Sequence, residues 1–202
     1  QKKISKLRKI HKTIGAFQTR NIPHLGHERI IQLLLKHANH VVLNPVIGPK
    51  VKSDINIEEY SDILNDYLAE KYDGKVSLLP VIANMFYAGP REAIHHAKIR
   101  NRLGFTHFTV GRDHAGSEKA YNPADAPKLA SKFSSSLGLE IIVHNGAAFC
   151  PTCNKTIIVG ECSHSVDKYV EISGSQFREK LRRGEHYQFA DKQLEKKIGI
   201  IS

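Results

Sequence analysis

The sequence has 202 residues, of which 41% are hydrophobic and 25% charged, enough for one α/β domain with a small appendage and unlike a disordered chain. Lys and Arg exceed Asp and Glu by 30 to 20, and this net charge of +10 favours anionic partners, although lysines scattered over a solvated surface give the same count. No apolar run could cross a bilayer and the basic start lacks a secretory apolar stretch, which predicts a cytoplasmic protein without membrane contact.

Short apolar runs alternate with longer amphipathic runs along most of the chain. The short runs are predicted to be buried strands, at residues 13–17, 40–46, 76–82, 106–110 and 139–144. The longer runs are predicted to be helices, at residues 26–38, 57–72, 90–103 and 123–137, and Gly74, Gly104 and Gly138 follow three of them where C-terminal caps belong. This alternation predicts an α/β fold, a Rossmann-like parallel sheet with flanking helices and right-handed crossovers.

The first predicted strand leads into QTRNIPHLGHE, residues 18–28. His24 and His27 lie three positions apart at the start of a helix, so both imidazoles can reach a single polyphosphate where unpaired N–H groups and the dipole favour anions. The donor fork of Arg20 suits a tetrahedral oxyanion, and a loop is expected to let Gln18 converge on it. Two alternatives are a helix cap with two surface histidines and a metal site, and the metal site lacks an acidic partner at the expected spacing.

Two further segments place glycines beside polar side chains. YAGPREA, residues 87–93, precedes the third helix, and GRDHAG, residues 111–116, follows the fourth strand. Glycine lets the backbone approach a ligand closely, and Arg112 and His114 add donors beside an anion, whereas Asp113 is expected to orient its neighbours. Either segment alone is also compatible with a turn and a salt bridge. Together with the first segment they predict one site at the carboxyl edge of the sheet.

Near the end, ISGSQFR at residues 172–178 opens a predicted helix that continues through Arg182. Ser173 or Ser175 can cap this helix, and Arg178 lies about one turn inside it. A plain capping motif on a basic surface helix is the alternative explanation.

The three cysteines lie close together and are followed by a histidine: Cys150, Cys153, Cys162 and His164. Such a set suits tetrahedral zinc, and the β-prone residues 156–159 predict a small zinc-pinned hairpin whose metal is structural. Three free thiols are one alternative. A redox Cys-x-x-Cys pair is another, although it leaves Cys162 unexplained.

These segments, taken together over residues 13–185, resemble those of ATP sulfurylases (sulfate adenylyltransferases), a family of the HxGH nucleotidyltransferase superfamily. The resemblance implies that sulfate attacks the α-phosphorus of MgATP and gives adenosine 5′-phosphosulfate and pyrophosphate, without a covalent intermediate or a general base. It also implies that Mg²⁺ arrives with ATP. Some bacterial and archaeal members carry a similar Cys₃His element, which supports structural Zn²⁺ here.

The resemblance also assigns roles to individual residues. The catalytic residues would be Arg20, His24, His27 and Arg112. Sulfate would be held by Gln18, Arg20 and the backbone at Ala115. ATP would be held by Thr19, Asn21, His24, His27, Gly111, Asp113, His114, Ser173 and Arg178. Metal would be held by Cys150, Cys153, Cys162 and His164. The expected division is a nucleotidyltransferase α/β domain at 1–148, a zinc-binding hairpin insert at 149–165, and a C-terminal helical part of the catalytic domain at 166–202.

The sequence departs from the family pattern at three positions. Leu25 and Phe86 stand where the family usually has Arg, and Val51 stands where it usually has Lys, although Lys50 and Lys52 flank it. The N-terminal domain that usually precedes the catalytic one has no counterpart in these residues.

Several alternatives remain open at this stage. The departures leave open a nucleotidyltransferase of the same fold that acts on another oxyanion or phosphorylated acceptor, and an inactive regulatory homologue. A basic zinc-containing nucleic-acid-binding module would need exposed aromatics among its basic residues, yet aromatics are only 7%, so nucleic acid is not the expected partner. A homo-oligomer is a possible assembly.

Overall fold

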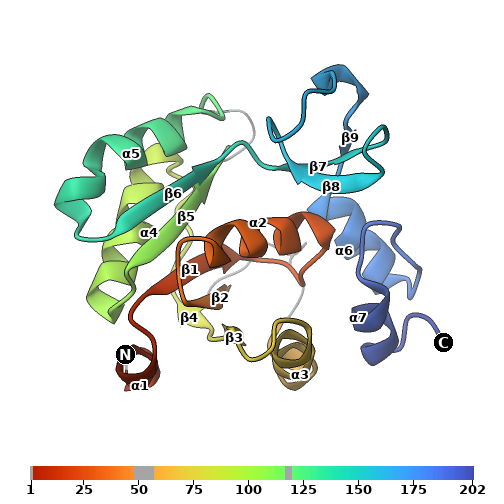
Figure 1. Ribbon diagram of the computed structural model, residues 1–202, viewed down its shortest axis with the longest axis horizontal. Coiled ribbons are helices and arrows are strands. Elements are labelled where there is room, and N and C mark those ends of the chain that lie inside the picture. Colours follow the sequence, from red (N-terminus) through yellow and green to blue (C-terminus); the bar gives the residue numbers. More distant parts are fainter. Residues whose placement is uncertain (1, 48–56, 117–119) are drawn as a thin grey trace.

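The computed structural model describes residues 2–47, 57–116 and 120–202 (Figure 1). A sheet in the order β3-β2-β1-β5-β6 forms its centre, and all these pairings are parallel. The strands are β1 (Ile14–Thr19), β2 (His40–Ile47), β3 (Val76–Leu78), β5 (His107–Gly111) and β6 (Glu140–His144), and β4 (Val81–Ile82) pairs with β2. The chain runs outward from β1 to β3 and returns on the other side of β1, so the strand order reverses between β1 and β5. The predicted α/β fold with a parallel sheet is confirmed.

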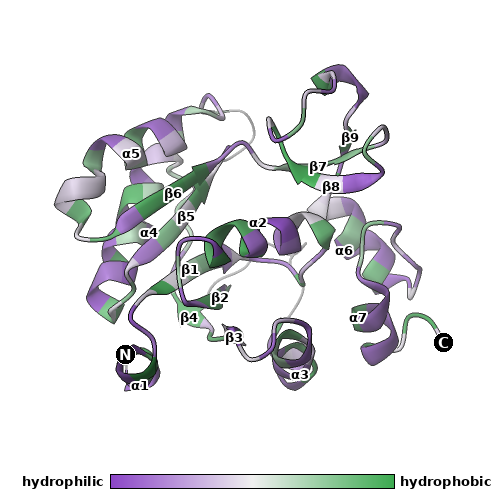
Figure 2. Cartoon of the chain, in the orientation of Figure 1, coloured by the Kyte–Doolittle hydropathy of each residue, from purple (hydrophilic) through white to green (hydrophobic). Residues whose placement is uncertain are grey.

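Helices cover both faces of this sheet. They are α1 (Lys2–Ile10), α2 (Leu25–Leu35), α3 (Ser61–Lys71, after the 3₁₀ turn η1 at Ile57–Tyr60), α4 (Pro90–Leu103) and α5 (Asp125–Leu137). Alternate residues of β1 face opposite layers, because Phe17 packs with Leu34 of α2, whereas Ala16 packs with Ala97 of α4. The strands are correspondingly the most hydrophobic part of the chain (Figure 2), as expected for strands buried on both faces.

The structure corrects four details of the predicted elements. The predicted strand at 76–82 is two short strands, because Pro80 has no N–H to donate and interrupts the ladder. Strand β1 continues to Thr19, two residues further than predicted. The predicted helix at 123–137 begins only at Asp125, and the basic N-terminal segment forms α1, whose single buried residue, Ile4, gives little periodic signal.

The last quarter of the chain, from Ala147 onward, forms a smaller layer beside α2 (Figure 1). Strands β7 (Ala147–Cys150), β8 (Lys155–Ile158) and β9 (Val170–Glu171) form an antiparallel sheet in the order β8-β7-β9, with the 3₁₀ turn η2 at Val166–Lys168. Helices α6 (Gly174–Arg182) and α7 (Lys192–Lys197) follow. Lys71 ties α7 to the domain, since its Nζ atom lies 2.6 Å from Glu28 Oε2 and 2.5 Å from Asp191 Oδ2. Within the described ranges, none of the helices has the length and apolar character needed to span a bilayer.

Candidate functional site

The carboxyl ends of β1 and β5 are neighbours at the point where the strand order reverses, the edge at which parallel sheets bind ligands. A cavity of about 810 Å³ opens there and continues into two smaller cavities of about 320 and 160 Å³. Eleven of the residues predicted from the sequence line these cavities: Gln18, Thr19, Arg20, Asn21, His24, His27, Gly111, Arg112, Asp113, His114 and Ala115.

His24 and His27 form a reciprocal cap at the N-terminus of α2. His24 is the N-cap residue, and its Nδ1 accepts from the His27 backbone N–H at 3.3 Å, while His27 Nδ1 accepts from the His24 backbone N–H at 3.4 Å. The two rings stack with their centroids 3.7 Å apart. Because both Nδ1 atoms are acceptors, each neutral ring carries its proton on Nε2 and can donate that N–H to a ligand.

Burial keeps both imidazoles neutral. It lowers the pKa of His24 to about 4 and the pKa of His27 well below its usual value, and the charge of Arg178 acts in the same direction on His24. Neutral Nε2–H donors at a helix N-terminus can bind phosphate oxygens without a pH-dependent charge.

Asn21 and α6 close the other side of this pair. The Arg178 guanidinium donates to Asn21 Oδ1 at 2.5 Å, and Ser173 caps α6 by accepting from the Gln176 N–H at 3.4 Å. A Cβ atom at Gly174 would lie 3.0 Å from Asn21 Nδ2, so a larger residue there would require the Asn21 amide to shift by a few tenths of an ångström. Arg178 therefore reaches the site through Asn21, Ser173 contributes as the cap of α6, and neither of them lines the three cavities.

A similar close approach holds His24 itself. A Cβ atom at Gly26 would lie 3.0 Å from His24 Cε1, so the ring lies directly over the glycine. We refer to Asn21, His24 and His27 together as the histidine cradle.

Gln18 and Arg20 line the same 160 Å³ cavity next to the histidine cradle. Gln18 belongs to β1, which extends to Thr19, and Arg20 directly follows the strand, so the two side chains come together at the start of the loop. Arg20 is fixed by Tyr87, whose hydroxyl accepts from Arg20 Nη1 at 3.0 Å. Gln18 is held by a residue of α4, since its Nε2 lies 3.1 Å from Nδ1 of the buried His96.

Residues 111–116 form the opposite wall. Asp113 and Ala115 both have φ of +53°, an unusual backbone conformation for residues with a Cβ atom. The Ala115 carbonyl accepts from the Gly89 N–H at 3.0 Å, which holds the 87–93 and 111–116 segments against each other. The three segments predicted to share one site are therefore neighbours.

His144, at the end of β6, belongs to the same site and was missed. It lines the 810 and the 320 Å³ cavities, and its Nδ1 accepts from the Gly146 N–H at 3.1 Å, which again leaves Nε2 as the donor. Burial lowers its pKa to about 4. Its position as the last residue of a predicted parallel strand was the signal that could have found it.

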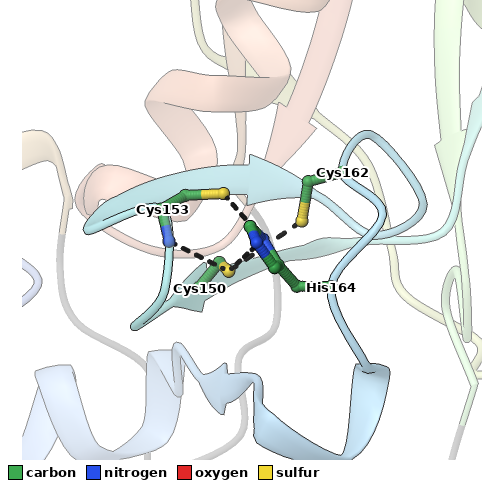
Figure 3. Close-up of side chains that lie close together, drawn as sticks. All are labelled: Cys150, Cys153, Cys162 and His164. Carbon is green, nitrogen blue, oxygen red and sulfur yellow. Dashed lines mark hydrogen bonds between the residues drawn. The ribbon is translucent and has the colours of Figure 1, made fainter.

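The Cys₃His cluster lies apart from these cavities, at the far end of the β7–β8 hairpin (Figure 3). One ligand atom from each of Cys150, Cys153, Cys162 and His164 lies within 4.8 Å of all the others. The Sγ atoms of Cys162 and Cys150 are 3.9 Å apart, and Cys153 Sγ is 3.2 Å from His164 Nδ1.

This donor set fits a tetrahedral metal. Zinc–sulfur bonds of about 2.3 Å place two sulfur ligands about 3.8 Å apart, close to the separation of Cys162 and Cys150. The Cys153 N–H also donates to Cys150 Sγ at 3.4 Å, and Asn154 takes φ of +52° to turn the loop back. The cluster can therefore hold a metal ion, as the sequence predicts.

Two of the departures from the family pattern fall on described residues. Leu25 packs against the core and its N–H donates to the Phe189 carbonyl at 2.8 Å, so it faces the protein interior. Phe86 is 65% exposed and meets the edge of the His95 ring at 6.4 Å. The third departure, Val51 with its flanking Lys50 and Lys52, lies outside the described residues.

Comparison with known proteins agrees with this geometry. The family model ATP-sulfurylase matches residues 2–189. The chain is 39% identical over 175 residues to the sulfate adenylyltransferase of Aeropyrum pernix, and 40% identical over 179 residues to that of Pyrococcus abyssi. Both alignments include 86% of this chain but only 45% and 46% of the relatives, so the chain spans about half the length of the curated relatives it matches.

A solved structure shows the same fold. The hexameric APS kinase from Thiobacillus denitrificans superposes with a TM-score of 0.67 over 97% of this chain and 38% of that one, at 16% sequence identity. At this identity the likeness concerns the fold alone.

Proposed function

The chain belongs to the ATP-sulfurylase family, and from that premise we propose that it transfers the adenylyl group of ATP to sulfate, giving adenosine 5′-phosphosulfate and pyrophosphate. The observation that carries the proposal is the histidine cradle beside the Gln18–Arg20 cavity. Two neutral Nε2–H donors at a helix N-terminus suit a polyphosphate, and an amide with a guanidinium two residues apart suits a small oxyanion.

In this reaction a sulfate oxygen forms a bond to the α-phosphorus while the bond from that phosphorus to the bridging oxygen of pyrophosphate breaks. Sulfate is already an anion, so no base has to remove a proton. Catalysis then depends on holding the two anions in line and on stabilising the charge that moves onto pyrophosphate.

The sulfate end of the site is assigned to Gln18, Arg20 and the backbone at Ala115. All three line the 160 Å³ cavity, a volume suited to a small tetrahedral anion. The bond from Arg20 to Tyr87 leaves the other guanidinium N–H groups for the anion.

The nucleotide end is assigned to the larger cavities. His24, His27 and Asn21 bind the phosphates, and Arg112, which lines the 810 and the 320 Å³ cavities, stabilises the charge that develops there. The remaining assigned residues shape this end by backbone contact or through Asn21: Thr19, Gly111, Asp113, His114, Ser173 and Arg178. We add His144 to this set because it faces both cavities.

Two metal ions complete the proposal. Mg²⁺ is bound to the phosphates of ATP and compensates their charge. The Cys₃His cluster holds Zn²⁺ in a structural role, because four protein ligands leave no open position for substrate.

The same proposal divides the chain into the nucleotidyltransferase domain at 1–148, the hairpin insert at 149–165 and the C-terminal part of the catalytic domain at 166–202. A cytoplasmic location and a homo-oligomer remain predictions.

The test is pyrophosphate release from MgATP by the purified protein, measured with a panel of acceptors: sulfate, selenate, molybdate, phosphate, a phosphonate and a sugar phosphate. Release that depends on sulfate, with adenosine 5′-phosphosulfate detected by chromatography, is the expected outcome. Release that depends only on a phosphonate or a sugar phosphate would assign the site to another acceptor. ATP binding without release for any acceptor would identify a regulatory homologue.

A further inference from the structure

A buried chain of polar side chains lies directly beneath the Gln18–Arg20 cavity, and its centre is His96 on α4. His96 is fully buried. Its Nδ1 atom lies 3.1 Å from Gln18 Nε2 and 3.1 Å from His114 Nε2. Its Nε2 atom lies 3.4 Å from a carboxylate oxygen of Glu92, one turn earlier on the helix. One imidazole thus joins α4 to the carboxyl ends of β1 and β5.

The surroundings fix where the His96 proton sits. Burial lowers the pKa of His96 to about 2, and the positive field of His114 and Arg100 acts in the same direction, so the ring is neutral and carries one proton. His96 Nε2 makes no hydrogen bond among the described residues, but the Glu92 carboxylate oxygen 3.4 Å away favours a proton over a lone pair at Nε2, which leaves Nδ1 as an acceptor. The Gln18 amide then turns its NH₂ group toward the Nδ1 lone pair, which His114 Nε2 also approaches to 3.1 Å.

This arrangement has a consequence for the anion cavity. The Gln18 Oε1 atom is buried and has no hydrogen-bond partner among the described residues. An amide that rotated by half a turn would exchange its oxygen and nitrogen, and the oxygen would repel a bound anion. By accepting one N–H of the amide, His96 holds the orientation in which the second N–H is left for the cavity that Gln18 lines.

Glu92 connects the same chain to Arg20. Its two carboxylate oxygens accept from the backbone N–H groups of Phe86 and Ala88, at 2.8 and 2.9 Å. Tyr87, between them, has φ of +55° and holds Arg20 through its hydroxyl. Glu92 therefore supports one anion-binding side chain through Tyr87 and orients the other through His96.

We propose that His96, oriented by Glu92, is a positioning residue that holds the Gln18 amide with its N–H toward the oxyanion. The inference rests on the proposed function and adds to it a determinant of oxyanion binding that lies outside the cavity. A histidine that only filled space in the core would not need an acceptor at Nδ1.

Two amide substitutions of His96 distinguish a positioning role from a purely space-filling role in the core. In His96→Asn the side-chain oxygen can occupy the place of Nδ1 and accept from Gln18, whereas in His96→Gln the amide reaches the place of Nε2, toward Glu92, and leaves Gln18 without its acceptor. His95→Asn is the matched control, because His95 is exposed on the same turn of α4. KM is measured separately for the oxyanion and for ATP, using the oxyanion that the wild-type protein prefers.

We expect His96→Gln to raise the KM for the oxyanion at least tenfold and the KM for ATP less than twofold. His96→Asn should stay within threefold of the wild type for both, and His95→Asn should match the wild type. Equal effects of Asn and Gln, or equal effects on both substrates, would overturn the inference and leave the proposed function standing. A wild-type protein that turns over with no oxyanion would instead remove the proposed function and this inference together.

A measurement on the wild type keeps the inference testable if either variant fails to fold. Nitrogen-15 NMR of histidine-labelled protein distinguishes the two neutral tautomers, and the His96 signals can be assigned by their absence from any folded His96 variant or through bonds from the backbone. We expect the Nε2–H tautomer from pH 6 to 8. A proton on Nδ1 would overturn the inference.

Discussion

The histidine cradle and the Cys₃His hairpin both bring imidazoles and polar atoms together, yet they are held in opposite ways. In the histidine cradle the fold holds the side chains: β1, α2 and α6 surround it, and His24 and His27 complete backbone hydrogen bonds of α2. In the hairpin four side chains from the end of β7, the following turn and the loop after β8 converge on one point (Figure 3). Only Cys150 among them is buried, so we expect a metal bound there to hold this part of the fold. We therefore expect chemistry that needs exact positions in the first region and metal-dependent folding in the second.

The largest effect that tests this comparison is expected from His27→Ala. Loss of its Nε2–H donor should lower kcat by about 100- to 1,000-fold, the range seen when one preorganised donor is removed. Loss of its part in the capping box should cost only about 1 kcal/mol of unfolding free energy. Turnover is measured by pyrophosphate release and stability by urea unfolding.

The control for this change is His37→Ala, since His37 is exposed beyond the other end of α2. It should leave kcat unchanged. If His27→Ala also retained wild-type turnover, the role of the histidine cradle in catalysis would be refuted.

Removal of the metal should lower the stability of the protein and leave its affinity for ATP nearly unchanged. Chelation, or Cys153→Ser, is expected to lower the melting temperature by several degrees, because metal binding and local folding are the same process in such a site. The Kd for ATP should change less than threefold, although Ala147 and Ala148 of β7 line the large cavity. Calorimetry with and without chelator measures the first quantity and equilibrium dialysis the second.

Elemental analysis supplies the control, with about one zinc per chain expected. Cys153→Ser should respond little to chelator. A wild-type melting temperature that chelator leaves untouched would contradict the metal assignment.

The pH dependence should separate the two regions further. Burial holds the folded-state pKa of His24 and of His144 near 4, below the usual value of 6.5, and that of His27 well below it. As the pH falls from 6.5 toward 4, these histidines become protonated in the unfolded state but stay neutral in the folded state. The free energy of unfolding therefore decreases over this pH range. The loss is at most about 1.4 kcal/mol per pH unit and per histidine.

The same slope should persist after chelation, because it originates in buried histidines outside the Cys₃His cluster: His24, His27, His40, His96, His114 and His144. ATP affinity should stay flat from pH 6.5 to 8, since these imidazoles are neutral throughout. The test is to measure the free energy of unfolding at pH 5, 6 and 7. A free energy that rises toward pH 5 would contradict the conclusion that these histidines are neutral in the folded protein.

The sequence predicted much of this arrangement because local rules and tertiary packing agree there. Strand periodicity, the glycine at 104 that takes φ of +101°, and the Ser173 cap are all short-range features, and all were found. Three features depended on tertiary context instead. Helix α1 is fixed by one buried side chain, Ile4, the break at Pro80 depends on which neighbour β3 pairs with, and His144 has no motif of its own.

The smallest expected effect concerns a link between the two regions. Glu161, in the loop after β8, accepts from Arg29 of α2 at 2.5 Å and 3.1 Å and from the Ile158 N–H at 2.7 Å. The pair is partly exposed, so Glu161→Gln should cost no more than about 1 kcal/mol of unfolding free energy, and less at high salt. An amide oxygen can still accept from Ile158, which isolates the negative charge of Glu161 opposite Arg29 as the variable.

If the fold holds the histidine cradle independently of the hairpin, Glu161→Gln should leave kcat and the KM for ATP within twofold of the wild type. A double-mutant cycle with Arg29→Gln measures the coupling between the two side chains directly. A tenfold loss of kcat from the single change would mean that the hairpin positions α2, because Arg29 lies only two residues beyond His27 on that helix. The hairpin and the histidine cradle would then be structurally coupled, and the metal would influence catalysis through the Arg29–Glu161 ion pair.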